Sequence, residues 1–200
     1  MTATGIVLAG GRSSRFGSSK LDADLEGRTV LDRTIDAVAE AVDEVVVVGR
    51  PGSHLRARFA VERRRDQGPL GGIERGLELA TTDQAIVVGG DMPLVVPALL
   101  RRMVAELVTG PGVRAAALDV AGWTSPLPLA VNVAAARAVV ATLLEPRPTS
   151  LRRLLGELQA RSIAESQWRL LDPDGDSLLD VDLPADLERV RQRLRSQAGS

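Results

Sequence analysis

Short apolar runs that end at glycine are the sequence feature that most restricts how this chain can fold. Residues 4–7, 45–48 and 85–88 are such runs, and one or two glycines follow soon after each of them. The second run is all valine, which is typical of a strand buried on both faces of a parallel sheet. Helical patterns separate the runs. This alternation predicts a three-layer α/β fold with a mainly parallel sheet.

Hydrophobic spacing and capping residues predict further elements. The other expected strands are 60–62, 113–118 and 127–132. The clearest expected helices are 30–42, 97–108 and 134–144. Thr29 is expected to cap the first of these helices. Prolines interrupt the strand at 127–132, so we expect that strand at a sheet edge or at a bulge.

The composition excludes several classes of function. The formal net charge is −1 and the arginines are dispersed, so nucleic acid is not an expected partner. The chain has no cysteine, so a metal must bind oxygen ligands or the single histidine, His54. No stretch approaches the roughly 20 apolar residues of a membrane span, and the chain enters its first strand without a leader pattern. We therefore expect a soluble cytoplasmic protein with no membrane contact.

The loop after the first apolar run has the composition of a phosphate-binding segment. It reads Leu-Ala-Gly-Gly-Arg-Ser-Ser-Arg-Phe-Gly-Ser-Ser-Lys over residues 8–20. Gly10 and Gly11 allow backbone N–H groups to approach an anion closely. Arg15 and Lys20 add positive charge, and Lys20 is the only lysine among the 25 basic residues. The glycine spacing matches neither a Walker A loop nor G-x-G-x-x-G.

A carboxylate follows the third apolar run. Gly89 and Gly90 lead to Asp91, and Pro93 stops the strand, so Asp91 is presented at the carboxyl end of a central strand. Magnesium binds one or two carboxylates together with phosphate oxygens and waters. Asp91 is therefore a candidate metal ligand, and its alternative role is to cap the following helix.

Four segments together resemble the motifs of a known enzyme family. They are the loop at 8–20, Gly-Pro-Leu-Gly-Gly at 68–72, Asp-Met-Pro at 91–93 and Asp-Val-Asp-Leu-Pro at 180–184. They resemble motifs of nucleotidyltransferases, and most of all those of the molybdenum cofactor guanylyltransferase family. The family's last motif is Asn-x-Asn-Thr-Pro, so both asparagines are aspartates in this chain. The resemblance extends along nearly the whole chain.

The resemblance implies a Rossmann-like fold and a magnesium-dependent reaction. GMP would pass from GTP to the terminal phosphate of molybdopterin, the organic part of the molybdenum cofactor, and pyrophosphate would leave. Residues 1–200 would form one domain, with nucleotide bound by the N-terminal half and the acceptor by the C-terminal half. The implied catalytic residues are Arg15, Lys20 and Asp91. The implied nucleotide contacts are Leu8, Ala9, Gly10, Gly11, Lys20, Asp66, Gly72 and Asp91. The implied metal ligands are Asp91 and Asp182. Transient contact with molybdoenzymes or other proteins of the cofactor pathway is also implied.

Several assignments stay open at the level of sequence. Asp66 can accept from guanine N1–H and N2–H, contact the ribose, or pair with a neighbouring arginine. Asp182 can bind metal or cap the last helix, and Asp180 is its alternative as a ligand. Val48 stands where the family tends to carry a polar nucleotide contact, which leaves base selection unexplained. The alternative functions are a cytidylyltransferase for the same cofactor, a sugar-phosphate nucleotidyltransferase, and a nucleotide-binding regulatory protein without turnover.

Overall fold

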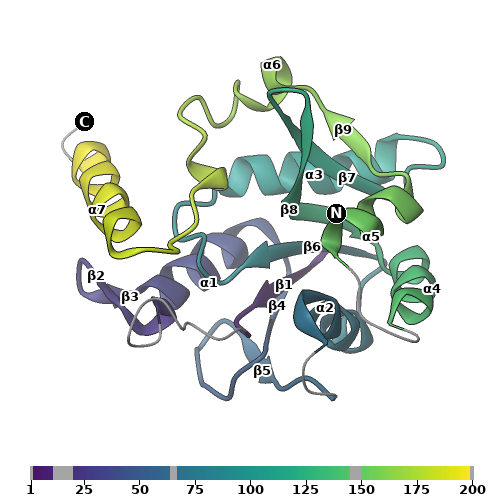
Figure 1. The fold of residues 1–200 in the computed structure, drawn as a ribbon, viewed down its shortest axis with the longest axis horizontal. Helices are drawn as coiled ribbons and strands as arrows, with labels where there is room; N and C mark the ends of the chain where they lie inside the picture. The colour runs from purple at the N-terminus through teal and green to yellow at the C-terminus, as the bar shows by residue number, and fades with distance from the viewer. Residues whose placement is uncertain (1, 11–19, 64–66, 145–149, 199–200) are drawn as a thin grey trace.

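A seven-stranded sheet forms the centre of the computed structural model, which describes residues 2–10, 20–63, 67–144 and 150–198 (Figure 1). The strand order is β5-β4-β1-β6-β8-β7-β9. The strands are β1 (Thr4–Leu8), β4 (Glu44–Val48), β5 (Arg58–Ala60), β6 (Gln84–Gly89), β7 (Ala115–Val120), β8 (Trp123–Asn132) and β9 (Arg161–Ile163). Of these, only β8 runs antiparallel to its two neighbours. The prediction of a mainly parallel sheet is confirmed.

Helices cover both faces of the sheet. One face carries α1 (Val30–Ala41), α3 (Pro97–Thr109) and the short α6 (Glu165–Trp168). The other face carries α2 (Gly68–Leu79), α4 (Val133–Leu143) and α5 (Leu151–Leu158). The expected cap of α1 is present, because Oγ1 of Thr29 accepts from the backbone N–H of Asp32 at 3.0 Å. The three-layer α/β/α prediction is also confirmed (Figure 1).

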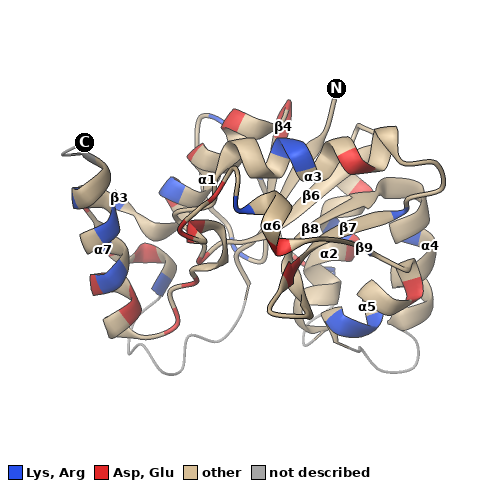
Figure 2. Cartoon of the chain, turned by 90° about the horizontal axis from the view of Figure 1, so that it is seen from above, with Lys and Arg blue, Asp and Glu red and all other residues tan. Residues whose placement is uncertain are grey.

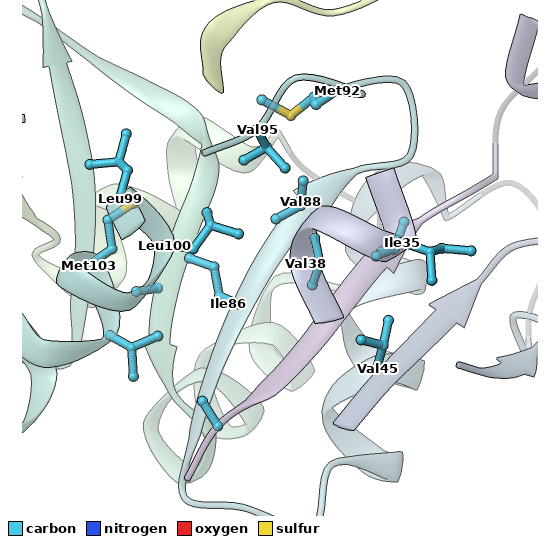
Figure 3. Close-up of a cluster of buried hydrophobic side chains, with 14 of the residues drawn as sticks. Ile35, Val38, Val45, Ile86, Val88, Met92, Val95, Leu99, Leu100 and Met103 are labelled. Atoms are coloured by element: carbon cyan, nitrogen blue, oxygen red, sulfur yellow. The ribbon is translucent and has the colours of Figure 1, made fainter. Parts of the chain in front are cut away.

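Alternating side chains along the strands build one apolar core on each face of the sheet. In β6, Ile86 and Val88 belong to the core under α1 and α3, whereas Val87 belongs to the core under α2, α4 and α5. Figure 3 shows Ile86 and Val88 between side chains of α1 and α3, among them Val38 of α1 and Leu100 of α3. Each side chain of this kind contributes about 1.5–3 kcal/mol when it is fully buried. These cores hold the central strand ends in a fixed register.

The C-terminal helix α7 (Pro184–Ala198) lies beside a hairpin from the N-terminal part of the chain (Figure 1). The hairpin consists of β2 (Asp24–Leu25) and β3 (Arg28–Thr29). A third apolar cluster joins Leu25 and Val30 to Val181 and Val190, and all four side chains are fully buried. The Arg191 guanidinium also donates to the backbone oxygen of Asp24 at 2.8 Å. These contacts hold the segment before α7 close to the N-terminal loops.

The structure decides between the two expected placements of one strand and shifts the bounds of another. The proline-containing strand is β8, which lies inside the sheet between β6 and β7 and not at an edge. It tolerates Pro126 and Pro128 because its pairing with β7 breaks between Leu129 and Thr124, at the register shift that we expected as a bulge. The weak strand expected at 60–62 is β5, which ends at Ala60.

Charged residues are distributed over the whole described surface. Figure 2 shows basic and acidic positions interspersed along α7 and over both helical layers. This distribution agrees with the near-zero net charge. Within the described residues, no helix has both the length and the apolar character needed to cross a bilayer.

Candidate active site

The central parallel strands end at one level of the sheet. Leu8 of β1 pairs with Val48 of β4 on one side and with Gly89 of β6 on the other. Ala60 of β5 pairs with Val48, so four strands finish together. Loops that leave the carboxyl ends of parallel strands in an open α/β sheet form its ligand-binding edge. The candidate site residues of the described chain follow these four strand ends or lie against them.

Close backbone packing at this edge depends on glycine. Gly49 has φ +117°, and a Cβ there would collide with the backbone N and Cα of Gly10. The backbone N–H of Ala9 donates to the oxygen of Val48 at 2.7 Å, and that of Gly90 donates to the oxygen of Leu8 at 2.9 Å. The first residues of the glycine-rich loop are therefore held between the ends of β4 and β6. The sequence analysis did not assign a role to Gly49, although its position directly after the valine run was visible.

Lys20 joins the acidic motifs at 91–93 and 180–184 in space. It opens the short 3-10 helix η1 (Lys20–Asp22). Its Nζ donates to Oδ2 of Asp91 at 2.5 Å and to Oδ1 of Asp182 at 2.6 Å. The three side chains are 19%, 23% and 62% exposed, respectively, so the lysine is the most enclosed of the three. Residues separated by 71 and 162 positions in the chain thus meet at one ammonium group.

The ammonium of Lys20 is strongly held in its charged form. Burial by itself lowers the pKa of Lys20, but the hydrogen bonds and charges of Asp182 and Asp91 outweigh burial, and the pKa is raised above its ordinary value. A third carboxylate, Asp180, lies close enough to respond to the same charges. Its pKa is raised by desolvation first and then by the negative charges of Asp182 and Asp91, while Lys20 acts in the opposite direction.

Backbone contacts position the two carboxylates. Asp91 follows the Gly89–Gly90 turn at the end of β6, and its backbone oxygen accepts from the N–H of Val181 at 2.9 Å. This bond aligns the C-terminal segment with the end of β6. Asp91 does not cap α3 in this arrangement. Val96 is the N-cap of α3, and Oδ2 of Asp186 accepts from the backbone N–H groups of Asp182 and Leu183.

The donor set around Lys20 fits a hard divalent cation. Two carboxylate oxygens from different chain segments already converge on a single positive centre. Magnesium takes oxygen ligands and uses one or two protein carboxylates, with waters and substrate phosphates completing its shell. Among the described residues, no group of three or more His, Cys, Asp or Glu residues is arranged to enclose a metal by itself. The arrangement therefore suits a cation shared with a phosphate ligand.

Glu62 is a further candidate site residue, which the sequence did not indicate. It follows β5, and its carboxylate lies against two glycines. A Cβ added at Gly10 would lie 2.9 Å from Oε1 of Glu62, and a Cβ added at Gly71 would lie 3.5 Å from Oε2 of Glu62. A Cβ at Gly72 would lie 3.0 Å from a methyl group of Leu8, so Gly72 allows the first turn of α2 to approach β1. The sequence offered little signal for Glu62, because it fell inside the strand expected at 60–62, whereas Asp66 lies just before the Gly-Pro-Leu-Gly-Gly motif.

The structure brings together most of the described residues named from the sequence. Leu8, Ala9 and Gly10 lie at the end of β1, Gly72 lies in the first turn of α2 and packs against Leu8, and Lys20 contacts Asp91 and Asp182. Gly11, Arg15 and Asp66 lie outside the described residues. Val48 is 1% exposed, and as a buried apolar side chain it offers no polar contact for a nucleotide base.

Comparison with curated proteins identifies close relatives of similar length. The chain is 31% identical over 200 residues to a probable molybdenum cofactor guanylyltransferase from Chloroflexus aggregans, covering 97% of this chain and 96% of that protein. It is 30% identical over 194 residues to a molybdenum cofactor guanylyltransferase from Syntrophotalea carbinolica, covering 94% of this chain and 90% of the relative. The resemblance expected from the four motifs is confirmed.

Solved structures share the fold. Molybdopterin-guanine dinucleotide biosynthesis protein A from Archaeoglobus fulgidus matches with a TM-score of 0.82 at 20% identity, covering 98% of this chain and 100% of that chain. Rv0371c from Mycobacterium tuberculosis, in complex with manganese, matches with a TM-score of 0.69 at 23% identity, covering 96% and 99%. Divalent-metal dependence is general among NTP transferases.

A family model agrees with both comparisons. The model of the MobA-like NTP transferase domain matches residues 5–165, which include the glycine-rich loop, Lys20, Glu62 and Asp91. The chain therefore belongs to the family of MobA-like NTP transferases.

Proposed function

We propose that this chain is a molybdenum cofactor guanylyltransferase that uses Mg²⁺. It transfers GMP from GTP to the terminal phosphate of molybdopterin and releases pyrophosphate. The observation that carries this proposal is the meeting of Lys20, Asp91 and Asp182 next to the end of β6, at the carboxyl edge of the sheet. The names of the full-length relatives support the choice of guanine and of this acceptor.

The reaction requires alignment and charge neutralisation, with no covalent enzyme intermediate. An oxygen of the acceptor phosphate attacks the α-phosphorus of GTP in line, the bond from the α-phosphorus to the bridging oxygen breaks, and that oxygen leaves with pyrophosphate. We assign Lys20 and Arg15 to the triphosphate and the backbone N–H groups of Gly10 and Gly11 to its oxygens. Asp91 and Asp182 would hold the magnesium ion, whose charge offsets that of the phosphates.

We assign recognition of the guanine base to Glu62, whose carboxylate lies against Gly10 and Gly71. A carboxylate has two acceptor oxygens that match the adjacent N1–H and N2–H donors of guanine. Adenine and cytosine do not present that pair of donors. Because Val48 is buried and apolar, base selection must come from a different group, and Glu62 is the described carboxylate that lies against both Gly10 and the start of α2. Asp66 remains the alternative residue for this role.

The assay that tests the function compares three nucleotides. The purified protein would be incubated with molybdopterin, Mg²⁺ and one of GTP, CTP or ATP, while pyrophosphate and the dinucleotide product are measured. Of the three nucleotides, we expect only GTP to give pyrophosphate and a dinucleotide product, which is molybdopterin guanine dinucleotide. Product formation with CTP would replace this proposal by cytidylyl transfer. Nucleotide binding with no pyrophosphate from any of the three would replace it by a regulatory function.

Cytidylyl transfer is the second candidate because one observation favours it. The chain has Asp180-Val181-Asp182 where the guanylyltransferase family has Asn-x-Asn, and Asp-x-Asp endings occur in related cytidylyl-transferring enzymes. The cytoplasmic location, acceptor binding by the C-terminal half, a single domain over residues 1–200 and transient contact with molybdoenzymes or other pathway proteins remain predictions.

A further inference from the structure

We propose that Lys20 is the built-in counter-ion of the metal site in the nucleotide-free protein, and that it must leave the two carboxylates before a divalent cation can bind there. In this arrangement the metal enters productively together with the nucleotide, because the triphosphate gives the displaced ammonium a new anionic partner. The inference rests on the proposed use of Asp91 and Asp182 as metal ligands. It adds an order of binding that the proposed function does not contain.

The contacts of Lys20 support this role directly. Its Nζ lies 2.5 Å from Oδ2 of Asp91 and 2.6 Å from Oδ1 of Asp182, so it occupies the oxygens that a shared cation would use. A magnesium ion bound to the same two oxygens would lie about 2.0–2.1 Å from each. An ammonium group and a divalent cation cannot occupy that space together, because both their volumes and their charges conflict.

The chain allows the side chain of Lys20 to move while its backbone stays in place. Lys20 opens η1, where its backbone oxygen accepts from the N–H of Ala23 at 3.3 Å, and the next side chain, Leu21, is 7% exposed. Four methylene groups separate the fixed Cα from the ammonium, so rotation within the side chain can carry the charge to a new partner. The glycine-rich loop that we assign to the phosphates joins η1 directly in sequence.

This exchange makes metal binding and nucleotide binding favour each other. Without nucleotide, a cation at Asp91 and Asp182 has to break both contacts of Lys20, which weakens its binding. With nucleotide present, the ammonium pairs with phosphate oxygens and the two carboxylates are open to the metal. Linkage requires the effect to be reciprocal, so metal also strengthens nucleotide binding by the same factor.

The test is a metal titration of the full chain without nucleotide or acceptor. Mn²⁺ affinity would be measured by calorimetry and by electron paramagnetic resonance for the wild type, Lys20→Met and Lys20→Gln. A matched control is Arg153→Met on α5, which removes one positive charge from a side chain that is 61% exposed. We expect both Lys20 variants to bind Mn²⁺ about tenfold more tightly than the wild type, since two partly exposed ion pairs no longer compete. Arg153→Met should bind Mn²⁺ as the wild type does.

A second measurement uses the wild-type chain and so does not depend on the folding of a variant. Because Lys20 is the only lysine, protein labelled with ¹³C-lysine gives the Cε signal of this side chain alone. We expect the signal to shift when Mg²⁺ and GTP are added together, and to shift with Mg²⁺ alone only at far higher concentration. Unchanged or weaker Mn²⁺ binding by both variants, or a lysine signal that stays constant at metal saturation, would overturn the proposal. Neither readout involves turnover, so failure here is distinct from failure of guanylyl transfer.

Discussion

At the scale of single residues, the site depends on ion pairs between one ammonium and two carboxylates. Asp91 and Asp182 approach closely enough to contact the same ammonium, and Lys20 provides the positive charge that makes their proximity favourable. Neutralising Lys20 would leave two carboxylates close together near the end of β6 without their shared counter-ion. Substitutions that keep the shape of a side chain and remove its charge therefore test the chemistry more cleanly than truncations.

We expect Asp91→Asn to reduce kcat for pyrophosphate release by roughly 10²–10³-fold, because one charged group that organises the transition state is lost. Asp83→Asn is the matched control, since Asp83 is an exposed residue just before the opposite end of the same strand, β6. Steady-state kinetics with GTP and molybdopterin would check both variants. Near-wild-type kcat in Asp91→Asn would remove Asp91 from the site as we describe it.

The substitution Lys20→Arg tests whether a compact ammonium is required. A guanidinium carries the same charge but is broader and planar, so we expect it to misplace the phosphates and to lower kcat/KM for GTP by about tenfold or more. The same kinetic assay, combined with a GTP binding titration, separates weaker binding from slower chemistry. Full activity in this variant would show that charge alone is sufficient at position 20.

The assignment of Glu62 to the base is tested by comparing GTP with ITP, which lacks the N2 amino group. We expect Glu62→Gln to lower kcat/KM for GTP by about 10–100-fold, because a charged acceptor of two hydrogen bonds becomes a neutral acceptor of one. The ratio of kcat/KM for GTP to kcat/KM for ITP should also be smaller in Glu62→Gln than in the wild type. Glu40→Gln, at an exposed position of α1, is the control. A GTP-to-ITP ratio that does not change in Glu62→Gln would exclude Glu62 and favour Asp66.

At the scale of elements, the site lies where the backbones at the ends of neighbouring strands pack closely against each other. The backbone of Gly10 lies against Gly49, and the first turn of α2 approaches β1 at Gly72. Both contacts depend on the missing side chains of glycine. The elements that carry the chemistry are thereby brought within reach of one nucleotide.

We expect Gly49→Ala to destabilise the protein more than Gly112→Ala does. Both glycines have positive φ, at +117° and +74°, so both substitutions carry backbone strain of about 1–3 kcal/mol. Only at Gly49 would the added Cβ also collide with a neighbouring backbone, because nothing lies within 4 Å of a Cβ at Gly112. Urea unfolding of the two variants would measure the difference. Equal losses would show that the contact between Gly10 and Gly49 can relax.

The sequence predicted the elements where local pattern and burial agree. The valine run of β4, the cap of α1 by Thr29 and the glycines after β6 were all visible in the chain. The interior position of β8 was not, because the break in its pairing that accommodates the prolines depends on the partner strand β7. The position of Glu62 was missed for a similar reason, since only the folded sheet shows which residue after β5 lies against Gly10.

At the scale of the whole molecule, the ion pairs and hydrogen bonds at the far end of the sheet secure the central strands. Glu44, at the start of β4, accepts from the hydroxyl groups of Thr4 and Thr81, from the backbone N–H of Thr81 and from Arg58. One carboxylate thus connects β1, β4, β5 and the loop before β6. Desolvation acts to raise the pKa of Glu44, but these hydrogen bonds outweigh it and the pKa is lowered.

The lowered pKa of Glu44 predicts a pH-dependent contribution to stability. The folded state holds the ionised form more strongly than the unfolded chain does, so the contribution is present above the ordinary pKa of 4.5 and is lost as pH falls through the lowered folded-state value. We expect Glu44→Gln to be less stable than the wild type at pH 7, with the gap narrowing below about pH 4.5. Urea unfolding at a series of pH values checks this, and a gap that is constant with pH would contradict it.

The proposed reaction depends on one cation site formed by Asp91, from the middle of the chain, and Asp182, from its C-terminal part. The most direct test is a crystal structure of the protein with Mn²⁺ and a non-hydrolysable GTP analogue, in which anomalous scattering locates the metal. We predict a manganese peak bound to the carboxylates of Asp91 and Asp182, with the Lys20 ammonium moved onto the phosphates. A metal and nucleotide bound elsewhere, with Lys20 still between the two carboxylates, would contradict the central claim.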